Sequence, residues 1–219
     1  MNAFTSLRLR YMDFPGRAQA IRDTLQIGRI DFVDEHLTYD QFSDCRAAGE
    51  FPFGGIPVLV IGTGDGEHCV AQSNAILRFA GRLTGLYPVD DPLQALKVDE
   101  VLGVGEDINC LLGPSLHEED AGRKMAMRKA LAEETLPYWM ACLDRLLVMN
   151  GNSGFIVGNS LTIARVTRNL SMSISQRNCP PRPTAPSTAR RSRKSMAAIS
   201  LRRTKTAWPE GLFVMYNSG

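Results

Sequence analysis

The chain has 219 residues, of which 44% are hydrophobic, enough to bury the core of one large domain or of two small domains that share an interface. No run of about 18 apolar residues occurs, so the sequence predicts no membrane-spanning helix, and charges within the first 20 residues argue against a secretory signal. The five cysteines are scattered without C-x-x-C spacing and the three histidines are isolated, which is typical of reduced thiols in the cytoplasm and not of a disulfide scaffold or a metal site.

The first 85 residues alternate between strand-like and helix-like hydrophobic patterns. In chain order, the predicted elements are a strand over 6–12, a helix over 16–26, a strand over 30–37, a short helix over 40–49, strands over 57–61 and 68–71, and a helix over 73–83. The order β-α-β-α-β-β-α predicts a small α/β sheet domain. Turn-forming residues over 85–92 then predict a linker.

Beyond the linker the pattern changes to that of long helices. One is predicted over 93–112 and is expected to break at Gly113-Pro114. A second is predicted over 118–148, with a kink at Pro137 inside it. After a loop, residues 160–162 have the character of a further helix start.

Residues 55–73 combine features that suit an extended ligand. Pro57 removes a backbone donor at the start of a strand, and it forces Ile56 into an extended conformation with its backbone free to pair. Gln72 and Ser73 bring an amide, a hydroxyl and the N–H groups of a helix start, which together bind a carboxylate. The sequence therefore predicts a peptide-binding cleft with an anion pocket at one end.

Three blocks, over residues 9–22, 53–59 and 72–77, resemble the cytosolic glutathione S-transferases, nearest to the sigma-like group with a catalytic tyrosine. The resemblance covers residues 4 to about 164. It implies an α/β N-terminal thioredoxin-like domain over 1–86 and an all-α C-terminal domain over 87–164 that is incomplete. It also implies a cytoplasmic homodimer that conjugates the glutathione thiolate to small electrophiles, with glutathione as co-substrate and no cofactor or metal.

The resemblance assigns roles at the end of the first strand. Tyr11 would donate a hydrogen bond to the glutathione thiolate, which is the nucleophilic form of the thiol. Arg17 would steady the surroundings of Tyr11 electrostatically, and an ordinary solvated helix arginine is an equally open interpretation. Gln72 and Ser73 would hold the γ-glutamyl end of glutathione. Ile56 would pair with its cysteinyl backbone, and the Ile56–Pro57 bond is expected to be cis.

Other implied glutathione-binding positions depart from the family pattern. Phe42 stands where sigma-like members have a tryptophan, so it packs but cannot donate. Arg46 replaces a lysine and keeps the charge, whereas Gly55 replaces a common glutamine and loses a side-chain contact. Asp107 aligns with the acid that reaches glutathione across the dimer, although its neighbour Glu106 could serve instead. These changes imply weaker glutathione binding.

The resemblance stops after Ala164. The family has an aspartate at the next position, where this chain has Arg165, so the capping box of the following helix loses its acceptor. Residues 165–219 hold nine Arg and two Lys against one acid, a formal charge of +10 against −8 for residues 1–164. We favour a reading-frame or splice error, because the loss is abrupt and falls inside a motif. The alternative is a genuine basic tail whose residues 189–194 resemble a nuclear-localisation or nucleic-acid patch.

Several functional interpretations stay open. A glutathione transferase is the leading one, with activity impaired because the helices that would follow Ala164 have no counterpart. We then expect apolar side chains of the two long helices, including Leu143, Leu146 and Leu147, to be exposed. A non-catalytic binding or structural protein, or a glutathione-dependent isomerase or peroxidase, are the alternatives. Nucleic acid is expected as a partner only through the basic tail.

Overall fold

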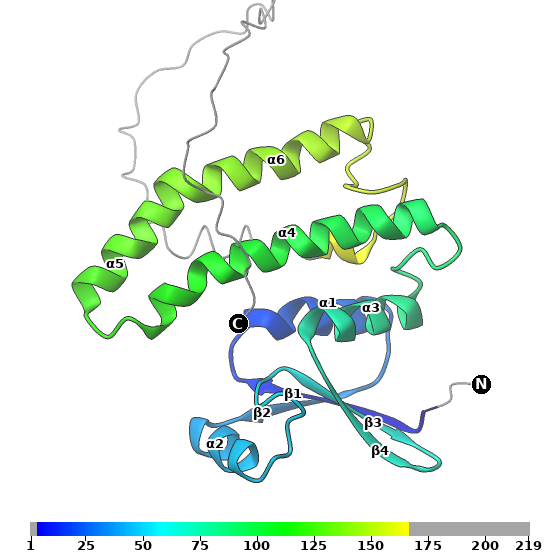
Figure 1. Cartoon of the computed structure of the whole chain (residues 1–219). Helices are drawn as coiled ribbons and strands as arrows, with labels where there is room; N and C mark the ends of the chain where they lie inside the picture. Colours follow the sequence, from blue (N-terminus) through cyan, green and yellow to red (C-terminus); the bar gives the residue numbers. More distant parts are fainter. Residues whose placement is uncertain (1–3, 167–219) are drawn as a thin grey trace, which may run out of the picture. The chain divides into compact units, whose positions relative to one another are not determined.

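The computed structural model describes residues 4–166, and its N-terminal half is built on a mixed four-stranded sheet (Figure 1). The strand order is β2-β1-β3-β4. Strand β1 (Ser6–Met12) runs parallel to β2 (Val33–Leu37) and antiparallel to β3 (Val58–Thr63), and β3 pairs antiparallel with β4 (Gly66–Ala71). The α/β sheet domain predicted from the order of elements is therefore confirmed.

Helices cover both faces of this sheet. A 3₁₀ turn η1 (Gly16–Ala18) leads into α1 (Gln19–Ile27), which packs beside α3 (Ser73–Thr84) on one face, while α2 (Tyr39–Ala47) lies at the other (Figure 1). The apolar residues of β1 and β3 that point toward α1 and α3, such as Leu9 and Leu59, are almost completely buried. Strand β2 starts at Val33 and not at residue 30, because the Ile30 N–H closes the turn after α1 on the Leu25 carbonyl and pairing with β1 begins at Val33.

The helical half begins with a helix longer than predicted. Helix α4 spans Pro92–His117, with Asp91 accepting hydrogen bonds from the backbone N–H groups of Leu93 and Gln94 at its start. The predicted break at Gly113-Pro114 is wrong, since Pro114 lies inside the helix. A proline removes one backbone hydrogen bond from a helix and crowds the preceding turn. Because Pro114 lies close to the C-terminal end of α4, only the last few residues of the helix follow it.

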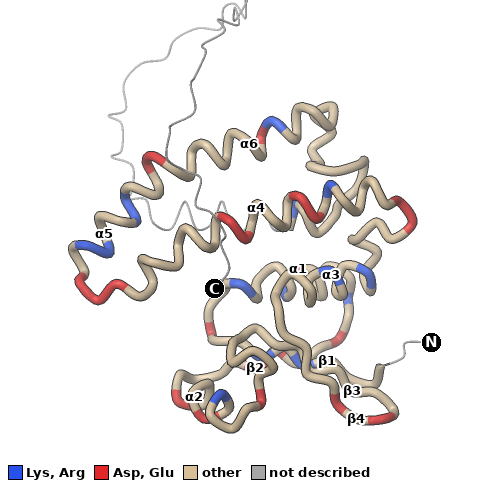
Figure 2. Tube along the Cα trace, in the orientation of Figure 1, with Lys and Arg blue, Asp and Glu red and all other residues tan. Residues whose placement is uncertain are grey.

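The second predicted long helix is divided in three. Helix α5 (Ala121–Ala130) is followed by a π-helical segment η2 (Leu131–Thr135) and by α6 (Leu136–Met149). The π-helical segment ends at Thr135, just before the first turn of α6, which contains Pro137; the ring and missing N–H of a proline do not fit a regular α-helical ladder. At the start of α5, Asp120 caps the helix and Glu118 pairs with Arg123. Figure 2 shows acidic residues at this turn and basic residues along α5.

One apolar cluster joins the sheet half to the helical half. It includes Leu77 of α3, Leu102 of α4, Leu143 of α6 and Ile163, which lies in a helical segment over 163–166. The Ile163 N–H also donates to the Leu86 carbonyl at 3.0 Å. The expectation that Leu143 is exposed is wrong: its side chain is 2% exposed, and Leu146 and Leu147 are partly buried against the same cluster.

Between residues 4 and 166, no helix is long and apolar enough to cross a membrane. The predicted domain boundaries at 86 and 164 stay predictions, and the predicted tail over 165–219 lies almost wholly outside the described residues.

Candidate active site

Strand register brings three of the predicted site segments to one end of the sheet. Arg10 of β1 is opposite Val58 of β3, and Val58 is opposite Ala71 of β4. Tyr11 follows Arg10, Pro57 precedes Val58 and Gln72 follows Ala71. These three residues therefore lie at the same end of the sheet. The Ile56–Pro57 peptide bond is cis, as expected from the sequence.

Tyr11 is held closely by the loop that follows it. Its side chain is 6% exposed, and its Oη accepts a hydrogen bond from the backbone N–H of Arg17 at 3.2 Å. The ring of Phe14 packs edge-on against the Tyr11 ring, with centroids 5.2 Å apart. Gly16 has a φ of +39°, and a Cβ at this position would overlap Tyr11 Oη. A residue without a side chain is therefore required for the loop to approach the hydroxyl.

The surroundings of Tyr11 favour the protonated form of its hydroxyl further. Burial raises the pKa of Tyr11 above its ordinary value of 10, and this effect outweighs the opposing influence of the Arg17 amide and of the positive charges of Arg17 and Arg22. At neutral pH the phenol is therefore a hydrogen-bond donor. An anion placed next to it would accept that hydrogen bond.

Arg17 contacts both Tyr11 and the helical half. Its guanidinium pairs with the Glu106 carboxylate of α4 at 2.5 Å, and this hydrogen bond is the main cause that raises the pKa of Arg17. Arg17 is thus ion-paired and not simply solvated. Asp107, the next residue along α4, is exposed. Of the two acids considered from the sequence, Glu106 is the one that lies at Arg17.

Gln72 has an unusual backbone conformation. Its φ of +78° and ψ of 104° are rare for a residue other than glycine, and its side chain makes no capping hydrogen bond to α3. Such conformations cost of order 1–3 kcal/mol and are concentrated at functional sites. The Gln72 side chain is exposed and Ser73, the first residue of α3, is half-buried. Both are accessible to a ligand at the strand ends.

The segment that contains α2 supplies the other predicted residues. Phe42 is half-buried and stacks on Phe51, with ring centroids 5.8 Å apart. Arg46 is exposed, and its Nε lies 3.5 Å from where a Cβ of Gly54 would be. Arg46 therefore reaches the turn that contains Gly55 and precedes Ile56. A capping box between Thr38 and Gln41 starts α2.

The sequence interpretation missed two residues near Tyr11, namely Phe14 and Arg22. Phe14 is 53% exposed and gave no recognisable signal. Arg22 is 6% exposed, and its position in the helix did carry a signal. It follows Ala18 by four residues and precedes Leu25 by three, so it lies on the apolar face.

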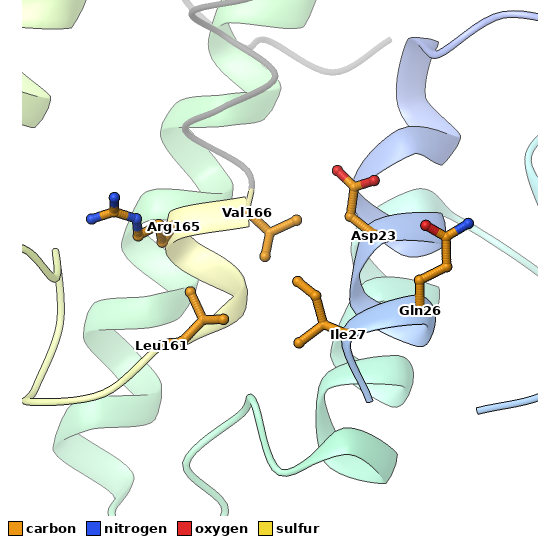
Figure 3. A pocket seen from close by; sticks show the side chains of 6 residues that line it. All are labelled: Asp23, Gln26, Ile27, Leu161, Arg165 and Val166. Atoms are coloured by element: carbon orange, nitrogen blue, oxygen red, sulfur yellow. The ribbon is translucent and has the colours of Figure 1, made fainter. Parts of the chain in front are cut away.

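A cavity of about 330 Å³ lies away from Tyr11, next to the other end of α1. Figure 3 shows Ile27 pointing from α1 toward Leu161 and Val166. None of the predicted glutathione-binding residues lines this cavity, and Val166 is the last described residue. The Arg165 guanidinium donates to the Gly154 carbonyl. Within residues 4–166 no group of His, Cys, Asp or Glu side chains could hold a metal ion.

Comparison with known proteins supports one family. The family "Glutathione S-transferase, C-terminal domain" matches residues 106–168. Glutathione S-transferase P of Bos taurus is 30% identical over 155 residues, which cover 70% of this chain and 69% of the bovine protein. This chain belongs to the glutathione S-transferase family. Glutathione S-transferase 2 of Caenorhabditis elegans is 27% identical over 176 residues, covering 78% of this chain and 89% of that relative.

Solved structures of glutathione S-transferases show the same fold. A sigma class enzyme of Fasciola hepatica superposes with a TM-score of 0.70 at 22% identity, covering 80% of this chain and 82% of that one. A glutathione S-transferase of Necator americanus, described as monomeric, gives 0.65 at 27% identity, covering 77% and 80%. The predicted family, and the combination of a thioredoxin-like sheet domain with a helical domain, are confirmed.

Proposed function

We propose that this glutathione S-transferase binds glutathione at the shared end of β1, β3 and β4 and activates its thiol through Tyr11. The observation that carries the proposal is the buried Tyr11 hydroxyl at the strand end, which accepts a hydrogen bond from the Arg17 amide and whose pKa is raised by burial. The thiolate then attacks a small electrophile. No cofactor is required, because the reacting group belongs to glutathione.

The energy required is within reach of one hydrogen bond. Lowering a thiol pKa from about 8.5 by about two units needs roughly 2.7 kcal/mol of preferential stabilisation of the thiolate. A hydrogen bond to a charged acceptor contributes about 1.5–3 kcal/mol. Tyr11 can therefore supply most of the shift, provided that its hydroxyl stays aimed at the sulfur.

The other predicted residues would anchor the tripeptide around this sulfur. Ile56 presents backbone groups next to the cis bond, and Gln72 and Ser73 stand at the N-terminal end of α3, where backbone N–H groups favour a carboxylate. Arg46 lies beside the Gly54–Gly55 turn and would bind the glycyl carboxylate, with Phe42 and Gly55 forming the adjacent wall.

We infer a homodimer in the cytoplasm, as the family resemblance implies. Asp107 is exposed on α4, and in this arrangement it would reach the glutathione held by the second subunit. Sedimentation equilibrium of the full chain tests the assembly: a monomer at all concentrations would remove the role proposed for Asp107.

The decisive experiment measures conjugation of glutathione to a chromogenic aryl halide. Tyr11→Phe should keep the glutathione affinity within about threefold but lower turnover at neutral pH at least about tenfold, because only the bond to the thiolate is removed. Equal turnover of the two proteins would refute the role of Tyr11. Binding of glutathione by the parent protein without any turnover would favour the non-catalytic alternative, and weak turnover would fit an activity impaired by the unusual C-terminal segment.

A further inference from the structure

A buried arginine lies behind the loop that follows Tyr11. The Arg22 side chain projects from α1 and is almost completely buried. Its Nε donates to both carboxylate oxygens of Asp34 on β2, at 2.8 and 3.1 Å. A charge removed from water in this way needs both an ion-pair partner and hydrogen-bond acceptors for its remaining N–H groups.

Three hydrogen bonds from the two terminal nitrogens go to backbone carbonyls over residues 12–15. One terminal nitrogen donates to the carbonyls of Phe14, at 3.0 Å, and Pro15, at 3.4 Å. The other donates to the Met12 carbonyl at 3.4 Å. Only a planar guanidinium presents so many donors in a fixed arrangement, so a lysine cannot reproduce these contacts.

The same loop is held a second time from β2. His36 contacts Asp34 through Nε2 and Asp13 through Nδ1, both at 3.1 Å. His36 is directly opposite Tyr11 in the parallel ladder of β1 and β2. The loop is thus held at its backbone by Arg22, while its exposed Asp13 side chain contacts His36.

This loop sets the geometry of the proposed reaction. It connects Tyr11 to Gly16 and Arg17, and the Arg17 N–H is the group that binds Tyr11 Oη. The Arg22 guanidinium also lies 5.8 Å from the centre of the Tyr11 ring. A shift of the loop would move the Arg17 amide and free the hydroxyl to rotate or bind elsewhere.

We propose that Arg22, held by Asp34, is a positioning residue for Tyr11: it fixes the loop over residues 12–15 so that the Tyr11 hydroxyl stays aimed at the glutathione sulfur. The inference rests on the proposed function and adds to it a pair of residues that touch neither glutathione nor the electrophile. Its effect should therefore appear in the ionisation of the bound thiol and not in glutathione affinity.

The test uses the pH profile of kcat/KM and the ultraviolet absorbance of the bound thiolate, both measured on the full chain. Arg22→Met should raise the apparent pKa of the thiol by about one unit and lower kcat/KM at neutral pH about tenfold, with the KM for glutathione within about threefold. Arg22→Lys keeps the positive charge near the Tyr11 ring but cannot reproduce the set of carbonyl contacts. If those contacts position the loop, Arg22→Lys should behave like Arg22→Met. Restoration of the parent profile by lysine would overturn the positioning role.

Two further variants test the proposal if Arg22→Met folds poorly. Asp34→Asn retains an acceptor for Nε and should shift the profile in the same direction by less; no shift would contradict the proposal. Arg78→Met is the matched control, since Arg78 pairs with Asp99 at 2.7 Å and donates to the Asn74 carbonyl but lies away from the loop over 12–15. It should leave the thiol pKa unchanged, and an equal shift in this control would point to a general loss of packing.

A double variant separates failure of this inference from failure of the proposed function. If Arg22 acts through Tyr11, adding Arg22→Met to Tyr11→Phe should produce no further change in the thiol pKa. Additive shifts would place its action elsewhere and overturn the inference. If Tyr11→Phe itself leaves the profile unchanged, the proposed function fails; if Tyr11→Phe shifts it and Arg22→Met does not, only the positioning role fails.

Discussion

Replacing Gly16 by alanine should damage both the stability of the protein and its chemistry. A Cβ at this position would overlap Tyr11 Oη and would lie 2.7 Å from Phe14 Cε2 and 2.9 Å from Tyr11 Cε1. The Tyr11 ring is buried and cannot move away at low cost, whereas the largely exposed Phe14 ring has room to shift. The φ of +39° adds about 1–2 kcal/mol of backbone strain for a residue with a side chain.

The expected loss of stability is the sum of two contributions. Backbone strain of about 1–2 kcal/mol, together with about 1 kcal/mol for the hydrogen bond between the Arg17 amide and Tyr11, gives about 2–3 kcal/mol in the free energy of unfolding. Displacement of the hydroxyl by about 1 Å should lower turnover by about a hundredfold. Urea denaturation and steady-state kinetics with an aryl halide measure the two effects separately.

Gly49 provides a matched control for this substitution. It also has a positive φ, of +74°, but no atom lies within 4 Å of where its Cβ would be. Gly49→Ala should therefore show the cost of backbone strain alone, with turnover unchanged. If Gly16→Ala loses no more stability than Gly49→Ala and turns over like the parent, the close approach of this loop to Tyr11 has no functional consequence and the reasoning is wrong.

Three further outcomes are expected. Glu106→Gln should lower the free energy of unfolding by less than about 1 kcal/mol, because its ion pair with Arg17 is more than a third exposed, and a loss above about 2 kcal/mol in chemical denaturation would contradict this. Thr38→Ala should destabilise α2 by about 1 kcal/mol through loss of the capping box, seen as faster amide hydrogen exchange confined to that helix; exchange that rises equally throughout the sheet would argue against a local effect. The pKa of Asp91 is lowered, chiefly by the Gln94 backbone N–H, so its charged form stabilises the fold above its unfolded pKa of about 4 and that contribution is lost as the pH falls through the lower folded value. Asp91→Asn should therefore weaken the acid dependence of stability, and an unchanged acid limb would speak against this cap.

Much of the fold was predictable because its signals are local. The alternation of apolar residues in β1 and the helical spacing in α3 depend only on neighbours along the chain. The same is true of the turn residues around the linker and of the tendency of a proline to follow an extended residue. For this reason the order of strands and helices, and the position of Tyr11 at a strand end, agree with the structure.

The errors arose where the outcome depends on what surrounds a residue. A missing N–H and a crowding ring at Pro114 predict a break, yet α4 continues past this residue. Leu143 was expected to be exposed because the sequence predicted no helices after Ala164, but α4, α6 and Ile163 contribute to a common apolar cluster. Helix propensity and sequence periodicity take no account of such tertiary contacts.

The sequence by itself determined the elements, their order and the residue types available at the strand ends, because these follow from short-range periodicity and turn chemistry. Only the tertiary structure decided that Arg17 pairs with Glu106, 89 residues further along the chain, and that Arg22 binds Asp34 and the loop after Tyr11. These contacts join residues that are distant in sequence. Which arginine meets which carboxylate is fixed by how the helices pack on the sheet, and a linear pattern does not contain that information.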